Sequence, residues 1–160
     1  MLNFVNKNKL LTYVKFYFYY IINCRDREFM IFNETKTHEI TVDVVIMTMK
    51  YDALHVLLVK RTTEPFKDKW AIPGGYVRLS ENLDQAALRI LKERTNIDNV
   101  YLEQLYTFGD PLRHPNARVI TCAYFALVRA EDFNIVTTPE LGWHKISNLP
   151  ALAFDHKDII

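Results

Sequence analysis

A chain of 160 residues and 18.9 kDa has the length of one ordinary domain. Hydrophobic residues make up 49% of it and charged residues 24%, a globular composition that excludes a disordered or fibrous chain. Its formal net charge of +1 lacks the basic excess typical of a stand-alone nucleic-acid-binding protein. The two cysteines, Cys24 and Cys122, lie in no CxxC or Cys/His pattern. We therefore expect buried thiols and a reducing, cytoplasmic location.

The first thirty residues differ in composition from the rest of the chain. They hold eight of the 21 aromatic residues and none of the glycines or prolines. Lys15 interrupts an apolar run that is shorter than the roughly 20 residues of a membrane span, so a membrane role is disfavoured. We interpret residues 1–30 as a leader or appendage, either packed on the domain or preceding a true start at Met30. Residues 31–160 are the predicted domain, with a core at about 39–150.

Strands are predicted on both sides of a single helix. The segments Glu39–Met49 and Leu54–Arg61 are apolar and β-branched, and the short polar turn between them is typical of a β-hairpin. The sequence Pro73-Gly74-Gly75 is expected to break the strand that precedes it. Further strand-like segments are Val100–Phe108, Arg118–Val128 and Leu141–Ile146. This order predicts a mixed α/β (α+β) domain built on a largely non-parallel sheet.

The helix has clear start and stop signals. Asn82 and Gln85 have the spacing of a capping box, and Asn96 has the position of a left-handed C-cap. The apolar residues between the two caps recur at helical spacing: Leu83, Ala86, Ala87, Ile90 and Leu91. We therefore expect a helix with one apolar face, on which Ile90 packs into the core.

The segment from Gly75 to Ile97 carries the pattern that points to chemistry. It consists of the glycine, five residues, Glu81, seven residues, Arg89, and then Ile-Leu-Lys-Glu-Arg-Thr-Asn-Ile. This pattern resembles the Nudix box, and the resemblance covers about residues 39–150. It implies the Nudix fold, a mixed sheet with flanking helices in an α/β/α sandwich. It also implies Mg²⁺ or Mn²⁺ held against a diphosphate by carboxylates of the box helix.

The box is degenerate at its metal-binding positions. Its three carboxylate positions are occupied by Ile90, Glu93 and Arg94, and only Glu93 is acidic. Glu81 and Glu93 are the remaining catalytic and metal-binding candidates, so we expect Mg or Mn to be held weakly or not at all. Arg94 places a positive charge where the family places a dication. Its guanidinium either binds phosphate directly or is solvated on the helix face.

The flanking segments narrow the resemblance to ADP-ribose-type Nudix domains. Residues 100–111, 118–128 and 149–156 look like the branch that includes Nudix-related transcriptional regulators. In those regulators a winged helix follows the segment that corresponds to Asp155-His156. This chain ends four residues after His156, so we expect it not to bind DNA directly. We interpret Asp155-His156 itself as a helix start. The family implies a nucleotide ligand and a possible homodimer. The expected substrate-binding residues are Gly74, Gly75, Arg89, Arg94, Arg113 and Arg118.

Three functions remain open. The first is binding of a nucleoside diphosphate linked to another moiety, such as ADP-ribose, with weak or absent hydrolysis. The second is an active, Mg-dependent Nudix pyrophosphatase. The third is a truncated ligand-sensing module of a transcriptional regulator. Tyr106 and Phe108 could stack on a base in any of these, although alternate residues of a strand more often pack in the core.

Overall fold

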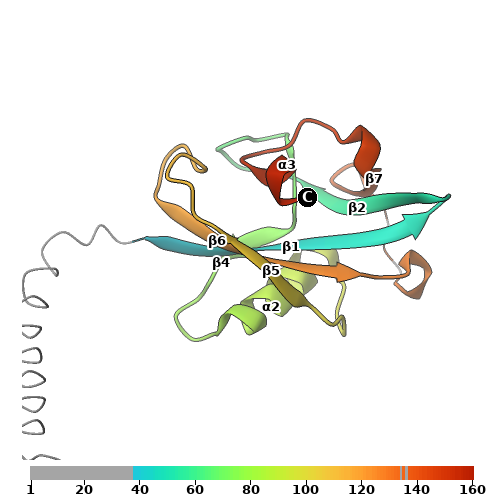
Figure 1. Cartoon of the computed structure of the whole chain (residues 1–160), viewed down its shortest axis with the longest axis horizontal. Helices are drawn as coiled ribbons and strands as arrows, with labels where there is room; N and C mark the ends of the chain where they lie inside the picture. The colour runs from blue at the N-terminus through green and yellow to red at the C-terminus, as the bar shows by residue number, and fades with distance from the viewer. Residues whose placement is uncertain (1–37, 134, 136) are drawn as a thin grey trace, which may run out of the picture. The chain divides into compact units, whose positions relative to one another are not determined.

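A seven-stranded mixed sheet is organised around its long central strand, β1 (Glu39–Lys50) (Figure 1). The computed structural model describes residues 38–133, 135 and 137–160, so the predicted leader and Cys24 lie outside the described residues. Strand β1 pairs in parallel with β6 (Val119–Leu127). On its other side, β4 (Gly74–Tyr76) and β2 (Ala53–Lys60) pair antiparallel with its first and second halves.

The remaining strands extend this sheet at its two edges. Strand β5 (Glu103–Phe108) pairs with β6, while β3 (Trp70–Ala71) and β7 (Leu141–Lys145) both pair with β2. The predicted hairpin of β1 and β2 is confirmed. Its two-residue turn, Tyr51-Asp52, has φ values of 50° and 55°, the left-handed conformation that tight hairpins need. The other predicted strands are also present, and β1–β6 is the parallel pair of a largely antiparallel sheet.

The helix α2 (Leu83–Thr95) has the predicted caps. The Asn82 side chain accepts a hydrogen bond from the Gln85 backbone N–H at 2.8 Å, and the Gln85 side chain accepts from the Asn82 backbone N–H at 3.0 Å. Asn96 ends the helix in the left-handed conformation, with φ 59°. Ile90 is 2% exposed, which confirms that this box position packs in the core instead of facing a metal.

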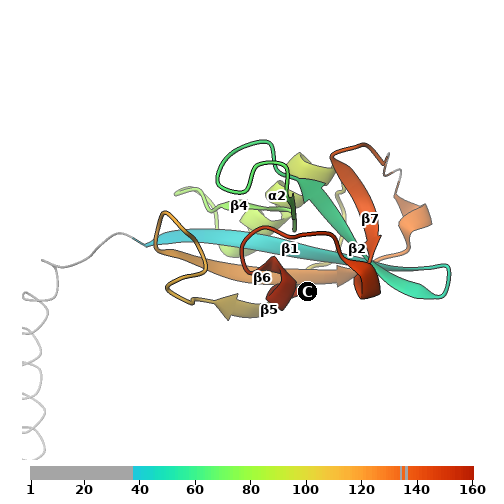
Figure 2. The same ribbon diagram turned by 90° about the horizontal axis from the view of Figure 1, so that it is seen from above.

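Apolar layers cover both faces of the sheet. On one face α2 packs against the even-numbered residues of β1, Val42, Val44 and Ile46. On the other face the C-terminal helix α3 (His156–Ile159) packs beside Val45 (Figure 2). Two short 3₁₀ helices, η1 (Ala130–Asp132) and η2 (Ile146–Asn148), flank β7. Successive side chains of a strand point to opposite faces, so Asp43 lies on the α3 side, as Val45 does.

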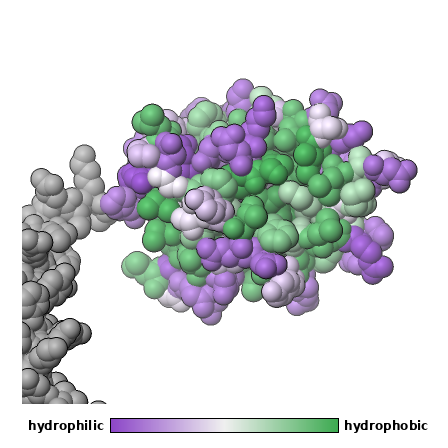
Figure 3. Space-filling model, viewed as in Figure 1, coloured by the Kyte–Doolittle hydropathy of each residue, from purple (hydrophilic) through white to green (hydrophobic). Residues whose placement is uncertain are grey.

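The surface crossed by β5 is partly apolar. Figure 3 shows hydrophobic residues near the middle of this view, with hydrophilic residues around them. Leu105, Tyr106 and Leu127 are 48%, 65% and 67% exposed. Phe108 packs against the core, whereas Tyr106 is exposed on the edge strand. None of the described helices has the length and apolar character needed to cross a membrane.

The strand break predicted at Pro73-Gly74-Gly75 is present, because β3 ends at Ala71, but the two glycines themselves form the next strand. Gly74 and Gly75 belong to β4, and no glycine of the described residues has a positive φ. Glycine is needed at position 74 for space. A Cβ there would lie far inside van der Waals contact of the Asp43 carboxylate, its cross-strand partner. At position 75 a Cβ would meet only the end of the Ile90 side chain, at an ordinary 3.5 Å.

We therefore expect Gly74→Ala to lower the free energy of unfolding by about 1–3 kcal/mol, because the buried Asp43 side chain has little room to move away. The matched control is Gly75→Ala, which should cost less than about 1 kcal/mol. Urea unfolding of both variants measures the difference. Equal effects of the two substitutions would contradict the steric explanation.

Candidate functional site

A cavity of about 600 Å³ opens beside β1 and β4, within the range of roughly 300–1,000 Å³ that is common for ligand sites. Its walls come from β1, β4, α2, the loop after β2, the β5–β6 loop and the C-terminal segment. Most of the predicted site residues line it: Gly74, Gly75, Arg89, Glu93, Arg94 and Arg113. Glu81 lies behind Arg89, and Arg118 is outside the lining, where it donates weakly to the backbone carbonyls of Asp110 and Val119.

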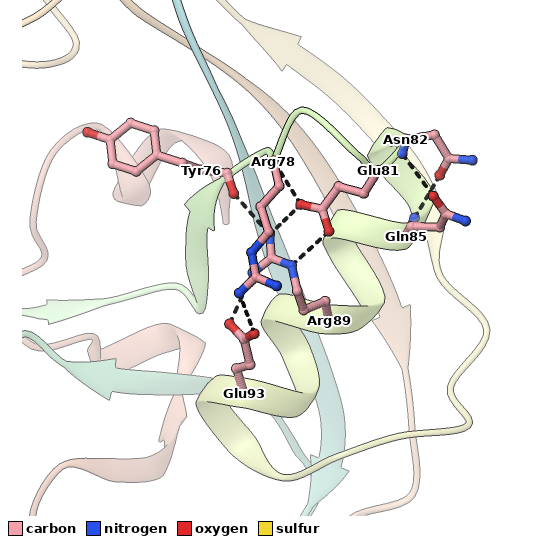
Figure 4. A network of polar contacts seen from close by, with 7 residues as sticks. All are labelled: Tyr76, Arg78, Glu81, Asn82, Gln85, Arg89 and Glu93. Carbon is pink, nitrogen blue, oxygen red and sulfur yellow. Dashed lines mark hydrogen bonds and ion pairs between the residues drawn. The ribbon is translucent and has the colours of Figure 1, made fainter.

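Arg89 connects the two glutamates that the sequence singles out (Figure 4). Its Nε donates to Glu81 Oε2 at 2.8 Å, and its Nη1 donates to Glu93 Oε2 at 3.0 Å. Arg78, from the loop before α2, donates to the other oxygen of Glu93 at 2.9 Å. The hydrogen bonds from Arg89 lower the pKa of Glu81 to about 2, and the same contacts raise the pKa of Arg89. Glu81 is therefore ionised, and both carboxylates are paired with guanidinium groups.

These side chains do not form a suitable metal centre. A hard dication needs several oxygen ligands that are free to coordinate it. Here the oxygens of Glu81 and Glu93 accept from Arg78 and Arg89, and position 90 carries a buried isoleucine. In the part of the chain that the structure describes, no three His, Cys, Asp or Glu residues gather as a metal-binding group.

Two other arginines face the same cavity without a carboxylate partner. Among the described residues, no acidic oxygen lies within ion-pair distance of Arg61 or Arg94. Arg61 donates to the carbonyls of Thr63 and Pro65 and lies over the ring of Phe154, 4.8 Å from its centroid. Burial, and then the positive charge of Arg94, lower the pKa of Arg61. Two like charges thus lie close enough to repel each other beside the glycine strand.

A buried charge cluster forms another part of the cavity wall. Arg113 makes a bidentate ion pair with Asp155, with both N···O distances at 2.8 Å, and its Nη2 lies 3.6 Å from Asp43 Oδ2. His156 Nδ1 accepts a hydrogen bond from the backbone N–H of Ile72 at 2.9 Å. The neutral ring therefore carries its proton on Nε2, which faces Asp43. Arg113, a predicted substrate-binding residue, is already paired in this structure.

Comparison with known proteins decides the family. The profile of the NUDIX domain matches residues 37–160. The chain belongs to the NUDIX domain family. It is 37% identical over 126 residues to the ADPR responsive transcriptional repressor NtrR of Acinetobacter baylyi, a match that covers 75% of this chain and 50% of that protein. It is 34% identical to an ADP-ribose pyrophosphatase of Methanocaldococcus jannaschii, with coverage of 66% and 63%. The chain thus spans about half to two thirds of these relatives.

A solved structure extends the similarity to three dimensions. The NUDIX domain of Shewanella oneidensis NrtR, crystallised with ADP ribose, superposes with a TM-score of 0.70. The two sequences are 34% identical, and the match covers 79% of this chain and 86% of that one. The predicted Nudix fold is confirmed by this likeness and by the mixed sheet between helices.

The structure adds cavity-lining residues that the sequence pattern does not reveal. Asp43, Arg61 and Phe154 line the cavity but lie outside the box. Phe154 stacks on His114, with ring centroids 5.1 Å apart, and begins the segment that continues into α3. α3 begins at His156, so the predicted helix start is confirmed, although the Asp155 side chain pairs with Arg113 and does not cap the helix. For Asp43, the signal is an acidic residue within the apolar stretch Val42–Met47 of β1.

The pH dependence of stability tests the neutral state of His156. Burial lowers the pKa of its imidazole in the fold, so the unfolded chain binds this proton first as the pH falls. The free energy of unfolding should be constant above the ordinary histidine pKa of about 6.5 and decrease below it, and His156 should contribute at most about 1.4 kcal/mol per pH unit to that decrease. Urea unfolding between pH 5 and pH 8 measures this slope.

His156→Asn is the control, because its amide oxygen can replace Nδ1 as the acceptor but does not titrate. The slope of this variant should be shallower than that of the wild type. Some slope remains, since burial also lowers the pKa values of His114 and His144. An unchanged slope would show that His156 does not titrate as expected.

Proposed function

We propose that this chain binds ADP-ribose or a closely related nucleoside diphosphate ester, and hydrolyses it weakly or not at all. The observation that carries the proposal is the pair Arg61 and Arg94, two guanidinium groups without carboxylate partners on the wall of one cavity. A diphosphate between them would relieve their mutual repulsion and accept charge-assisted hydrogen bonds from both. The similarity to an ADP-ribose-responsive repressor and to an ADP-ribose-bound domain supports this class of ligand.

The remaining box residues support binding over turnover. Glu93 keeps its box position, but Arg78 and Arg89 occupy its oxygens. Arg89 keeps its position as well, and its charge is balanced by Glu81 and Glu93. Gly74 and Gly75 let the β4 backbone approach the ligand closely. Binding without turnover suits a sensor, and this chain is similar to an ADPR responsive transcriptional repressor.

Binding is tested by titration calorimetry with ADP-ribose in the presence of EDTA. We expect binding without added metal, because the arginines supply the positive charge. Arg94→Gln and Arg61→Gln should each weaken it by about ten- to a hundred-fold, the size of a lost hydrogen bond to a charged group. Arg129→Gln is a matched control, since Arg129 is paired with Asp132 near η1 and is absent from the cavity lining. Full affinity in both cavity variants would contradict the proposed phosphate site.

Hydrolysis is tested by following AMP release from ADP-ribose with Mg²⁺ or Mn²⁺. Losses around a metal site typically reduce affinity or activity by about 10–100-fold each. With two box carboxylates missing, the rate should be roughly 10²–10⁴-fold below that of the Methanocaldococcus jannaschii relative assayed alongside. Rapid release that Glu93→Gln abolishes would instead identify the chain as a working pyrophosphatase.

A further inference from the structure

Asp43 is a buried carboxylate that lacks a hydrogen-bond donor. It is 5% exposed, and it lines the cavity from the middle of β1. Its nearest cationic neighbours are Arg113 Nη2 at 3.6 Å and His156 Nε2 at 3.9 Å, both beyond the usual range of about 2.7–3.2 Å for a hydrogen bond. No described residue donates a hydrogen bond to it.

Such an arrangement is costly unless a donor from outside the protein completes it. Buried ionised groups in proteins are almost always paired and hydrogen-bonded. The fold nevertheless makes room for this carboxylate, because the glycine at position 74 leaves the space that a Cβ would fill. The carboxylate is therefore accommodated on the cavity wall with acceptor capacity that the described residues leave unused.

The charges around Asp43 restrict what can donate to it. Its cationic neighbours are Arg113, Arg61 and, when protonated, His156. A cationic ligand group would be repelled by the two arginines at any pH, and also by His156 once that residue is protonated. A phosphate group would be repelled by the carboxylate itself. A neutral donor satisfies both conditions, and the hydroxyl group is the neutral donor that diphosphate esters of sugars carry.

We infer that Asp43 accepts a hydrogen bond from a sugar hydroxyl of the ligand, so that the cavity distinguishes a sugar-bearing diphosphate from a bare one. The inference rests on the proposed function, because it requires the diphosphate to lie at Arg61 and Arg94. Gly74 links the carboxylate to the arginines: it is the cross-strand partner of Asp43 on β1, and it lines the same pocket as Arg94. Arg113 and His156 act as positioning residues that fix the carboxylate.

The test compares ligands that differ by single hydroxyls. Calorimetry gives the affinities of wild type and Asp43→Asn for ADP-ribose, for its analogues that each lack one ribose hydroxyl, and for inorganic pyrophosphate. At least one analogue should bind the wild type about ten- to a hundred-fold more weakly than ADP-ribose. In Asp43→Asn that difference should shrink at least fivefold. The variant should bind pyrophosphate as tightly as the wild type or more tightly, because a negative charge has been removed.

Glu64→Gln is the matched control. It removes a negative charge from an exposed residue of the same cavity, so it should affect pyrophosphate similarly but keep the discrimination between hydroxyls. If Asp43→Asn does not fold, the wild-type series decides alone, and equal affinities within twofold overturn the inference. Full discrimination in a folded Asp43→Asn also overturns it and leaves the proposed function intact. Failure of the wild type to bind ADP-ribose and pyrophosphate overturns both.

Discussion

The burial of one carboxylate within the central strand constrains the whole site. Strand β1 is hydrogen-bonded to neighbours on both sides and covered by apolar layers on both faces. The space for the Asp43 carboxylate and the positive charges beside it therefore come from the surrounding segments. One neighbouring strand supplies a glycine, the β5–β6 loop supplies Arg113, and the C-terminal segment supplies His156. The side of the Asp43 carboxylate that these segments leave uncovered faces the cavity.

The box helix keeps its structure although only one of its three carboxylate positions is acidic. The caps and the apolar face of α2 are intact, and Ile90 extends that face by one buried residue. The retained glutamates then pair with arginines, so their negative charge is compensated within the protein. Arg94 adds a further positive charge at the cavity. In the proposed function, these side chains provide the positive charge that a divalent metal would otherwise bring to the diphosphate.

Much of the fold could be predicted because it depends on local signals. The caps of α2, the hairpin turn and the apolar, β-branched run of β1 are short-range patterns, and the structure has all of them. The site was only partly predictable. Nothing near Arg113 in the sequence indicates that Asp155 will occupy it, since the two are brought together by the C-terminal segment. The need for glycine at position 74 was hidden for a related reason: it depends on the Asp43 side chain of another strand and not on the φ angle of Gly74.

The cavity wall joins segments from nearly the full length of the domain. Asp43 comes from the first strand, Arg94 from the helix, and Phe154 from the C-terminal segment. Partly folded chains lack one or more of these segments, so a ligand that contacts all of them recognises only the completely folded domain. By linkage, its binding energy would then add to the global stability of the fold. Occupancy would protect β1 and the C-terminal segment together against proteolysis and hydrogen exchange, although they are distant in sequence.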